Sequence, residues 1–296
     1  MQKKEIHINE VLVIKGWLVV NGFLNSSKFN EIYEWLRIAF EKRGHSIDVY
    51  TNIELSNVEN VLDKPDFVLF WDKDITLAKR LEKMGLKLFN SAKAIENCDN
   101  KALTYIELKN KVYMPETIIA PMTYRNIGYN NTEFVENVVE RLGLPVVIKE
   151  CFGSFGQQVY LADSLEEALD IVKKTKEPLV FQRFIAESRG RDVRINVVGG
   201  KAVAAMLRYN KNDFRANITN GGNMEKYKPD KSEIETSEKV CHILGLDFGG
   251  VDILFGENGP VVCEVNSNAH FKNIYECTGV NVADYIAEYI ERCLAG

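Results

Sequence analysis

Two carboxylates and an amide within residues 249–272 are the groups of this chain that most clearly suggest chemistry. The segment reads GGVDILFGENGPVVCEVNSNAHFK. A hairpin here places Asp252 opposite Glu264, and strand alternation puts Asn266 on the same face as Glu264. Carboxylates that face each other across a ladder repel, so we expect a cation between them, and an all-oxygen set suits Mg²⁺ better than zinc. The alternative is a hairpin whose acidic face points into solvent.

The turn of this hairpin sets its register. Residues 251–255 and 260–265 predict two strands, and residues 257–259 suit a three-residue loop with glycine at the left-handed position. This loop pairs Gly256 with Pro260. Counting inward from that pair gives the opposition of the two carboxylates.

A glycine-bearing loop follows a predicted strand that ends in Lys149. Residues 151–158 read CFGSFGQQ, and the candidates in this loop are Gly153, Ser154, Phe155 and Gly156. Glycines let backbone N–H groups approach phosphates closely, and the lysine adds positive charge. The loop matches neither the Walker A pattern nor the dinucleotide fingerprint. An ordinary hairpin turn is the alternative.

Polar side chains also gather after the predicted strand 179–185. An extended backbone there can hydrogen-bond an adenine edge, and carboxylates suit ribose hydroxyls. The residues concerned are Gln182, Arg183, Phe184, Ile185, Glu187 and Asp192. Arginine forks match phosphate or acyl-phosphate oxygens, which makes a second group a candidate: Arg194, Arg208, Arg215 and Asn217. The alternative for both groups is a charged surface with ion pairs.

Composition limits the classes of function. The chain has 296 residues, 46% hydrophobic and 27% charged, as is ordinary for a soluble protein of about two domains. A net charge of −5 argues against nucleic acid as a partner. The six cysteines lack metal-site spacing and favour a reduced, cytoplasmic setting. No apolar run is long enough for a membrane span, so we expect no membrane partner.

Alternating strands and helices must position these groups. In the first part of the chain, strands at 16–22, 45–50, 66–71 and 87–89 alternate with helices at 29–42 and up to 83, which predicts a parallel sheet. Ligands bind at the carboxyl ends of such strands, so residues 21–25 and 72–74 could border a substrate site. Later segments predict helices at 95–108, 133–142, 165–174, 232–244 and 282–293, and strands at 117–120, 144–150, 159–161, 179–185, 192–198 and 202–208.

The order of these motifs resembles the ATP-grasp superfamily. The succession is Lys101, VVIK ending at Lys149, FGSFG, QRFI, DVR, DFRAN and VDIL…EVN, over roughly residues 95–290. It is most similar to the ribosomal-protein glutamate ligases of the RimK type and the related lysine-biosynthesis carrier-protein ligases. The first part of the chain fits the α/β domain that precedes the ATP-grasp fold in these proteins.

The resemblance implies a role for each matched position. Lys101 and Lys149 would hold ATP phosphates, Gly153–Gly156 would close over them, and Gln182–Ile185 would meet adenine. Glu187 and Asp192 would lie on the ribose side, and Arg215 and Asn217 would contact the nucleotide. Arg194 and Arg208 would face phosphate or the acyl-phosphate as the catalytic residues, and Asp252, Glu264 and Asn266 would bind the metal.

The implied activity is that of an ATP-dependent carboxylate–amine ligase. A carboxylate would attack the γ-phosphate of ATP, with Mg²⁺ or Mn²⁺ neutralising charge, and an amine would convert the acyl-phosphate to an amide, releasing ADP and phosphate. The substrates would be small-molecule or peptide acids and amines, and a homo-oligomer is an expectation from RimK-type relatives. The alternatives are a peptide- or carrier-modifying enzyme and a non-catalytic ATP-binding module.

One segment departs from the family pattern. After EVN these ligases usually continue with a small segment containing proline and glycine, whereas residues 267–273 here read SNAHFKN. We therefore expect His270 and Lys272 to shape substrate choice. The glutamate specificity of the relatives is not carried over.

The expected architecture is mixed α/β and α+β. A parallel-sheet domain over residues 1–94 would precede a two-lobed ATP-grasp fold. Its central lobe would span residues 95–184 and its C-terminal lobe residues 185–296.

Overall fold

The computed structural model describes residues 13–153 and 156–295. Its first part is a parallel sheet of order β2-β1-β3-β4, as predicted. The strands are β1 (Lys15–Val20), β2 (Ser46–Thr51), β3 (Phe67–Trp71) and β4 (Leu88–Phe89), and the helices are α1 (Ser27–Glu41) and α2 (Ile75–Lys83). Side chains of β3 alternate between the core under α1 and the core under α2. Helices thus cover both faces, so β3 is a continuous apolar run.

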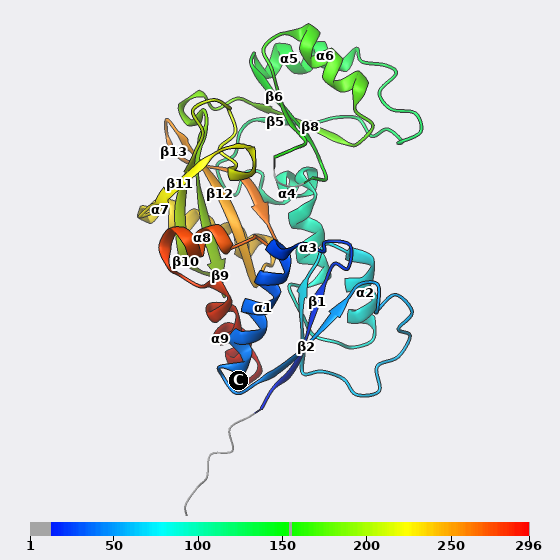
Figure 1. Cartoon of the computed structure of the whole chain (residues 1–296). Coiled ribbons are helices and arrows are strands. Elements are labelled where there is room, and N and C mark those ends of the chain that lie inside the picture. The colour runs from blue at the N-terminus through cyan, green and yellow to red at the C-terminus, as the bar shows by residue number, and fades with distance from the viewer. Residues whose placement is uncertain (1–12, 154–155, 296) are drawn as a thin grey trace, which may run out of the picture.

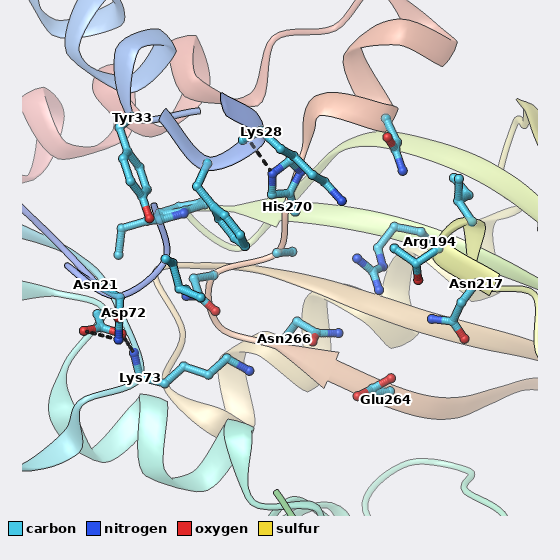
Figure 2. Close-up of a pocket in the computed structure, with 18 of the residues that line it drawn as sticks. Asn21, Lys28, Tyr33, Asp72, Lys73, Arg194, Asn217, Glu264, Asn266 and His270 are labelled. Atoms are coloured by element: carbon cyan, nitrogen blue, oxygen red, sulfur yellow. Dashed lines mark hydrogen bonds between the residues drawn. The ribbon is translucent and has the colours of Figure 1, made fainter. Parts of the chain in front are cut away.

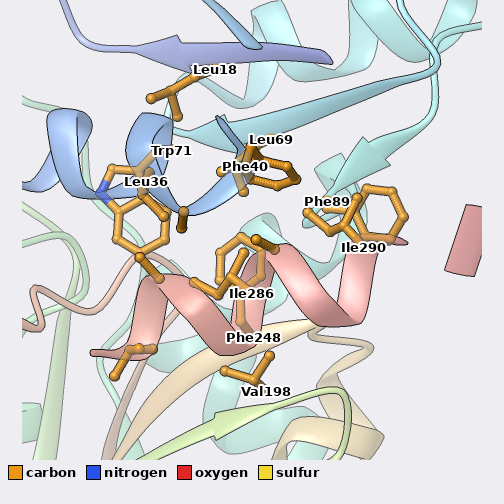
Figure 3. Close-up of a cluster of buried hydrophobic side chains, with 14 of the residues drawn as sticks. Leu18, Leu36, Phe40, Leu69, Trp71, Phe89, Val198, Phe248, Ile286 and Ile290 are labelled. Carbon is orange, nitrogen blue, oxygen red and sulfur yellow. The ribbon is translucent and has the colours of Figure 1, made fainter. Parts of the chain in front are cut away.

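The C-terminal helix belongs to the same core as the first helix. Helix α9 (Val282–Ala295) packs Ile286 and Ile290 against Leu36 and Phe40 of α1 (Figure 3). Phe248 of the C-terminal sheet joins this cluster. The proposed boundary at residue 94 therefore separates sheets, while the buried core crosses it.

The central lobe has a core of its own. Its antiparallel sheet has the order β5-β8-β6-β7 and carries two helices on one face (Figure 1). The strands are β5 (Thr117–Ile119), β6 (Val146–Glu150), β7 (Val159–Ala162) and β8 (Leu179–Arg183), and the helices are α5 (Phe134–Leu142) and α6 (Leu165–Lys174). Ser164 caps α6 by accepting the backbone N–H of Glu167, and the Glu167 side chain accepts the N–H of Asp163.

The C-terminal lobe is an antiparallel sheet of order β11-β10-β9-β12-β13. Its strands are β9 (Arg191–Val198), β10 (Lys201–Tyr209), β11 (Asn223–Lys226), β12 (Phe248–Gly256) and β13 (Gly259–Asn266). Helix α7 (Lys231–Leu244) packs on one face, and α8 (Lys272–Thr278) lies beside β10 and β11. Short 3₁₀ turns occupy Ala186–Ser188 and Ile218–Asn220. Neither β11 nor α8 was predicted, because both are short and lack periodicity.

The predicted helix 95–108 is wrong as a single helix. It consists of α3 (Ala92–Asp99) and α4 (Lys101–Leu108), separated by Asn100 in an extended conformation. The Asn100 side chain accepts the N–H groups of Ala102 and Leu103, which caps α4. The break puts Lys101 at the first position of a helix.

The hairpin of β12 and β13 has the predicted pairing of Asp252 with Glu264, although its turn differs from the prediction. Its turn is two residues long and pairs Gly256 with Gly259, so the predicted three-residue loop is wrong. A bulge at Cys263 adds one residue to β13, which cancels the difference in the turn. Asp252 therefore does lie opposite Glu264.

Among the described residues, every helix is too short or too polar to cross a membrane.

Candidate active site

A buried network of two aspartates and two arginines lies on three neighbouring strands. Register pairs Asp252 of β12 with Arg194 of β9, and Asp192 of β9 with Arg208 of β10. Arg208 donates to Asp192 at 2.6 and 2.7 Å, and its Nη2 also lies 2.9 Å from Asp252 Oδ2. Arg194 holds the other side of Asp252 through a two-point contact, with Nη2 at 2.7 Å from Oδ2. The network is neutral overall, so its buried charges compensate one another.

These arginines decide the charge of Asp252. Burial alone raises the pKa of this carboxyl, but the charges and hydrogen bonds of Arg194 and Arg208 outweigh it and hold the pKa below its usual range. Asp252 is therefore ionised and engaged by two guanidinium groups. It does not stand free opposite Glu264, as the hairpin geometry alone suggested.

The other two expected metal ligands face open space. Glu264 and Asn266 occupy alternate positions of β13 and both line the same cavity (Figure 2). Glu264 has a partner in Lys101, with 3.6 Å between Oε1 and Nζ. The buried side-chain nitrogen of Asn266 has no hydrogen-bond partner among the described residues. That nitrogen is a hydrogen-bond donor and cannot bind a metal, so the groups that fit a divalent cation here are the Glu264 carboxylate and the Asn266 side-chain oxygen.

A cavity of about 90 Å³, the smaller cavity, gathers most of the predicted nucleotide residues. It lies between the central lobe and the C-terminal lobe. Its lining includes Lys149, Gly156, Gln182, Arg183, Phe184, Ile185, Asp192, Arg208, Arg215, Asn217, Asp252 and Glu264. Residues that are far apart in the sequence thus converge on one site.

Arg215 ties the glycine loop to this cavity. Its Nη1 donates to the carbonyl oxygens of Gly156 at 2.7 Å and Val159 at 3.2 Å, and Asp213 holds the rest of the guanidinium. Gly156 has a positive φ of 71°, and a Cβ there would lie 2.7 Å from Asn217 Oδ1. Glycine is needed at this position both for conformation and for space. Ser154 and Phe155 lie outside the described residues.

The predicted strand 179–185 ends two residues early, at Arg183. The Arg183 side chain leaves the cavity and pairs with Glu116 at 2.7 Å, while Gln182 donates to Thr117 at 3.0 Å inside. Phe184 and Ile185 therefore line the cavity beyond the end of the regular ladder. Backbone groups at such a position can meet the edge of a base.

Three of the described residues predicted to contact the nucleotide do not line the smaller cavity: Lys101, Gly153 and Glu187. Glu187 is exposed in the short 3₁₀ turn. Lys101 lines a small adjoining space with Lys149, Gln182 and Glu264, and its Nζ is 3.4 Å from the carbonyl oxygen of Gly153.

A second cavity of about 370 Å³, the larger cavity, opens between the N-terminal sheet and the C-terminal lobe (Figure 2). Asn21, Leu24, Asp72 and Lys73 line it from the ends of β1 and β3, as the strand-end rule predicted. Lys28, Phe29 and Tyr33 of α1 line it as well, and no motif in the sequence marked them. Arg208, Asn217 and Glu264 line both cavities, so the two meet there.

The segment 267–273 contributes His270 but not Lys272. His270 lines the larger cavity, with its Nε2 at 3.3 Å from the carbonyl oxygen of Lys28 and its ring edge-on to Phe29. Burial, reinforced by the charge of Lys28, lowers the His270 pKa to about 4, so the ring is neutral at pH 7. Lys272 instead pairs with Glu31 of α1 and does not line the cavity, so its role in substrate choice stays a prediction.

A family model described as the RimK-like ATP-grasp domain matches residues 98–290. The chain belongs to the RimK-like ATP-grasp family. The family resemblance is thereby confirmed, and curated relatives of this chain are named synthases and ligases.

Three curated relatives show how far this similarity extends. An uncharacterized MG012 homolog of Mycoplasma pneumoniae is 31% identical over 82% of this chain and 87% of its own length. The β-citrylglutamate synthase B of Danio rerio is 35% identical over 74% of this chain, which spans only 54% of that protein. The human N-acetylaspartylglutamate synthase A is 34% identical, again over 74% of this chain and 56% of its own length. The RimK-like chain thus spans just over half of these two named synthases.

Solved structures support the two-lobed fold. A RimK-domain ATP-grasp protein from Sphaerobacter thermophilus matches with a TM-score of 0.69 at 20% identity, over 93% of this chain and 98% of that one. The ATP complex of D-alanine–D-alanine ligase from Bacillus anthracis matches with a TM-score of 0.71 at 15% identity, over 96% and 99%. At these identities the likeness shows the fold alone. The predicted combination of a parallel sheet and an ATP-grasp fold is confirmed.

Proposed function

We propose that this chain is an ATP-dependent carboxylate–amine ligase that works through an acyl-phosphate and releases ADP and phosphate. The observation that carries the proposal is the meeting of the two cavities at Arg208, Asn217 and Glu264. Phosphoryl transfer to a carboxylate needs the γ-phosphate and the acid side by side. A nucleotide in the smaller cavity and an acid in the larger one would meet at these three side chains.

Charge and backbone geometry support nucleotide binding in the smaller cavity. Lys149 is buried and Lys101 half-buried, so both ammonium groups are held in a site of limited water access, where their attraction for phosphate is strong. Arg215 holds the loop at Gly156 in place through its carbonyl oxygens. The base would lie at Gln182–Ile185, where the strand ladder ends.

The arginine network presents guanidinium N–H donors to the reacting groups. Arg194 lines the larger cavity while its Nε and Nη2 hold Asp252, which fixes the guanidinium plane. A carboxylate or phosphate oxygen would be received by an arginine that is already oriented, and such preorganisation lowers the barrier to transfer. The larger cavity, enclosed by α1 and the segment 267–273, would keep water from the acyl-phosphate.

For the metal, we propose Mg²⁺ with Glu264 and Asn266 as ligands, and Mn²⁺ as a substitute. Such an ion neutralises the negative charge that gathers on the phosphates during transfer. Asp252 can join the ligands only when a guanidinium turns from it to a phosphate oxygen. Within the described residues no group of three His, Cys, Asp or Glu side chains could hold a metal, and the ligand set proposed here includes the side-chain oxygen of Asn266.

The substrates we propose are a small-molecule or peptide carboxylate and an amine. A cavity of about 370 Å³ lies in the size range of sites for small ligands. A cytoplasmic setting is part of the proposal, because the six cysteines are free thiols and ATP must be supplied. The homo-oligomer stays a prediction.

The test is ADP release by the purified chain with Mg-ATP, in which acids and amines are supplied singly and together. We expect release to require both, and Glu264→Gln to reduce it at least 100-fold. The matched control is Glu257→Gln at the exposed turn of the same hairpin, which should retain wild-type rates. ATP binding without any substrate-dependent turnover would instead support a non-catalytic module. Full activity of Glu264→Gln would contradict the role of the cavity junction.

A further inference from the structure

Among the described residues, Asp72 in the larger cavity lacks an ion pair of the kind that several neighbouring charged side chains form. Arg194 and Arg208 are held by aspartates, Lys73 Nζ lies 2.7 Å from Asp99, and Glu264 pairs with Lys101. Asp72 is only 4% exposed, yet among the described residues it forms no ion pair within 4 Å. A buried carboxylate without a counter-charge is costly.

The hydrogen bonds of Asp72 come from neutral groups. Asn21 Nδ2 donates to its two oxygens at 3.1 and 3.3 Å, and the backbone N–H of Lys73 donates to Oδ1 at 2.7 Å. Burial raises the pKa of Asp72, and these hydrogen bonds only partly offset the effect. The neighbouring Lys73 ammonium is turned to Asp99, which also receives the Ser267 hydroxyl. The charge of Lys73 still lowers the Asp72 pKa, but that ammonium is paired with Asp99, so Asp72 is oriented without an ion pair of its own among the described residues.

Tyr33 adds a second polar group to the same end of the cavity. Its ring lines the cavity from α1, and burial followed by the charge of Asp72 raises its pKa to about 12. The phenol therefore stays neutral and can accept a hydrogen bond from a cationic group. Asp72, Asn21 and Tyr33 form an end that is rich in acceptors, and we name these three residues the acceptor end.

The opposite end of the cavity has the opposite character. Figure 2 shows Asn21 and Asp72 on one side of the cavity and Arg194, Glu264 and Asn217 on the other, where the cavity meets the nucleotide. Arg194, which is held by Asp252, presents its guanidinium group at that end. The larger cavity thus has the Asp72 carboxylate far from the nucleotide and the Arg194 guanidinium near it, while Lys28 and Lys73 also contribute to its lining.

Resting on the proposed function, we propose that the acid substrate is an amino acid or a peptide that is a zwitterion. Its cationic amino group would bind Asp72 at the acceptor end, and its carboxylate would lie beside Arg194 for activation. The cationic group belongs to the acid because an amine that attacks an acyl-phosphate must be uncharged. Asp72 lies on the side of the cavity opposite Arg194 (Figure 2), so an amino group held there is kept apart from the acyl carbon that the nucleophile must reach.

The test uses hydroxylamine as a small neutral acceptor with Mg-ATP, so that only the acid is selected. Its nitrogen attacks the acyl carbon and loses a proton, the C–O bond to phosphate breaks, and phosphate leaves with the electron pair. The acid probes are the proteinogenic amino acids and their N-acetyl derivatives, which keep the carboxylate but lose the cation. We expect a free amino acid to give hydroxamate with kcat/KM at least 100-fold above that of its N-acetyl form.

Asp72→Asn keeps the size of the side chain and its ability to accept hydrogen bonds from Asn21 and Lys73. It should lower kcat/KM for the free amino acid roughly 10- to 150-fold, the range for losing a hydrogen bond to a charged group. The N-acetyl form should react as in the wild type. The matched control is Asp48→Asn, an exposed aspartate on β2 of the same sheet, which should change neither value. Binding of a non-hydrolysable ATP analogue by calorimetry shows that each variant is folded.

Two results would overturn the inference while leaving the ligase proposal intact. One is preferred use of N-acetyl amino acids or other purely anionic acids by the wild type. The other is an unchanged preference for the free amino acid in Asp72→Asn. If no acid gave hydroxamate and ATP were not consumed, the proposed function would fail, and this inference with it.

Discussion

Arg208→Met should destabilise the chain strongly, and the destabilisation should shrink in acid. Arg208 is 5% exposed and donates three charge-assisted hydrogen bonds, two to Asp192 and one to Asp252. After the substitution Asp252 keeps Arg194. Asp192 keeps no hydrogen-bonding partner that the described residues show. The variant therefore leaves one buried carboxylate uncompensated.

The size of the effect follows from the two ways in which the chain can respond. Removing one partner of a buried ion pair typically costs about 3–5 kcal/mol. Asp192 can avoid the buried charge by binding a proton. The free energy needed for this protonation depends on the difference between the pH and the ordinary aspartate pKa of 3.8. At pH 7 that difference is about 3.2 pH units, or roughly 4.4 kcal/mol, and at pH 5 it is about 1.2 units, or roughly 1.6 kcal/mol. Protonation thus limits the cost of the unpaired charge to about 4 kcal/mol at pH 7, and this part of the loss should fall toward pH 5.

The number of protons bound by the folded and unfolded states sets the direction of this pH dependence. In the variant, folded Asp192 holds a proton that the unfolded chain has lost above pH 3.8, so the folded state binds more protons. The difference in free energy of unfolding between variant and wild type therefore narrows as pH falls from 7 toward 4. Urea denaturation followed by circular dichroism at pH 7, 6 and 5 measures it.

Arg183→Met is the control for this prediction. Arg183 is exposed and its pair with Glu116 lies at the surface, so its removal should change stability little at either pH. Equal losses for the two variants, or a loss for Arg208→Met that does not change with pH, would refute the account of the buried network.

Two further predictions address the glycine loop and the histidine of the larger cavity. Gly156→Ala should raise the apparent KM for ATP roughly tenfold, because a side chain at its positive φ is strained by about 1–2 kcal/mol and its Cβ would meet Asn217 at 2.7 Å. Gly200→Ala, with the same strain but nothing within 4 Å, should leave that KM unchanged, and equal KM values for the two variants would contradict the reasoning. His270 has a pKa lowered to about 4 in the folded chain, so the unfolded state binds more protons and stability should fall by up to about 3 kcal/mol between pH 6.5 and 4. This dependence, measured by urea denaturation, should be absent in His270→Phe and present in His242→Asn, which alters an exposed histidine.

Much of the fold could be predicted because its signals are local. The apolar run of β3 and the helical spacing of α1 mark buried elements whatever the rest of the chain does. The break at Asn100 also has a local signal, an asparagine cap, but continuous apolar spacing on both sides of it hid the boundary. The register of the β12–β13 hairpin could not be derived soundly, because the bulge at Cys263 depends on neighbouring strands.

The sequence indicated which residues line the candidate site, but not which of them pair with one another. The order of motifs indicated most of the residues that line the smaller cavity, since each motif keeps its place in the chain. That Asp252 is held by two arginines follows from the register of three strands, which no local pattern encodes. The larger cavity was harder still, because Lys28 and Tyr33 come from a helix whose sequence shows only ordinary amphipathic spacing.

The most direct measurement of the central claim uses an acid substrate labelled with ¹⁸O in its carboxylate. If a carboxylate oxygen attacks the γ-phosphate at the junction of the two cavities, the phosphate that is released should carry one ¹⁸O and the amide should keep the other. Mass spectrometry of the phosphate reports this directly. Unlabelled phosphate from a reaction that still forms the amide would show that no acyl-phosphate was made, and would contradict the proposed chemistry.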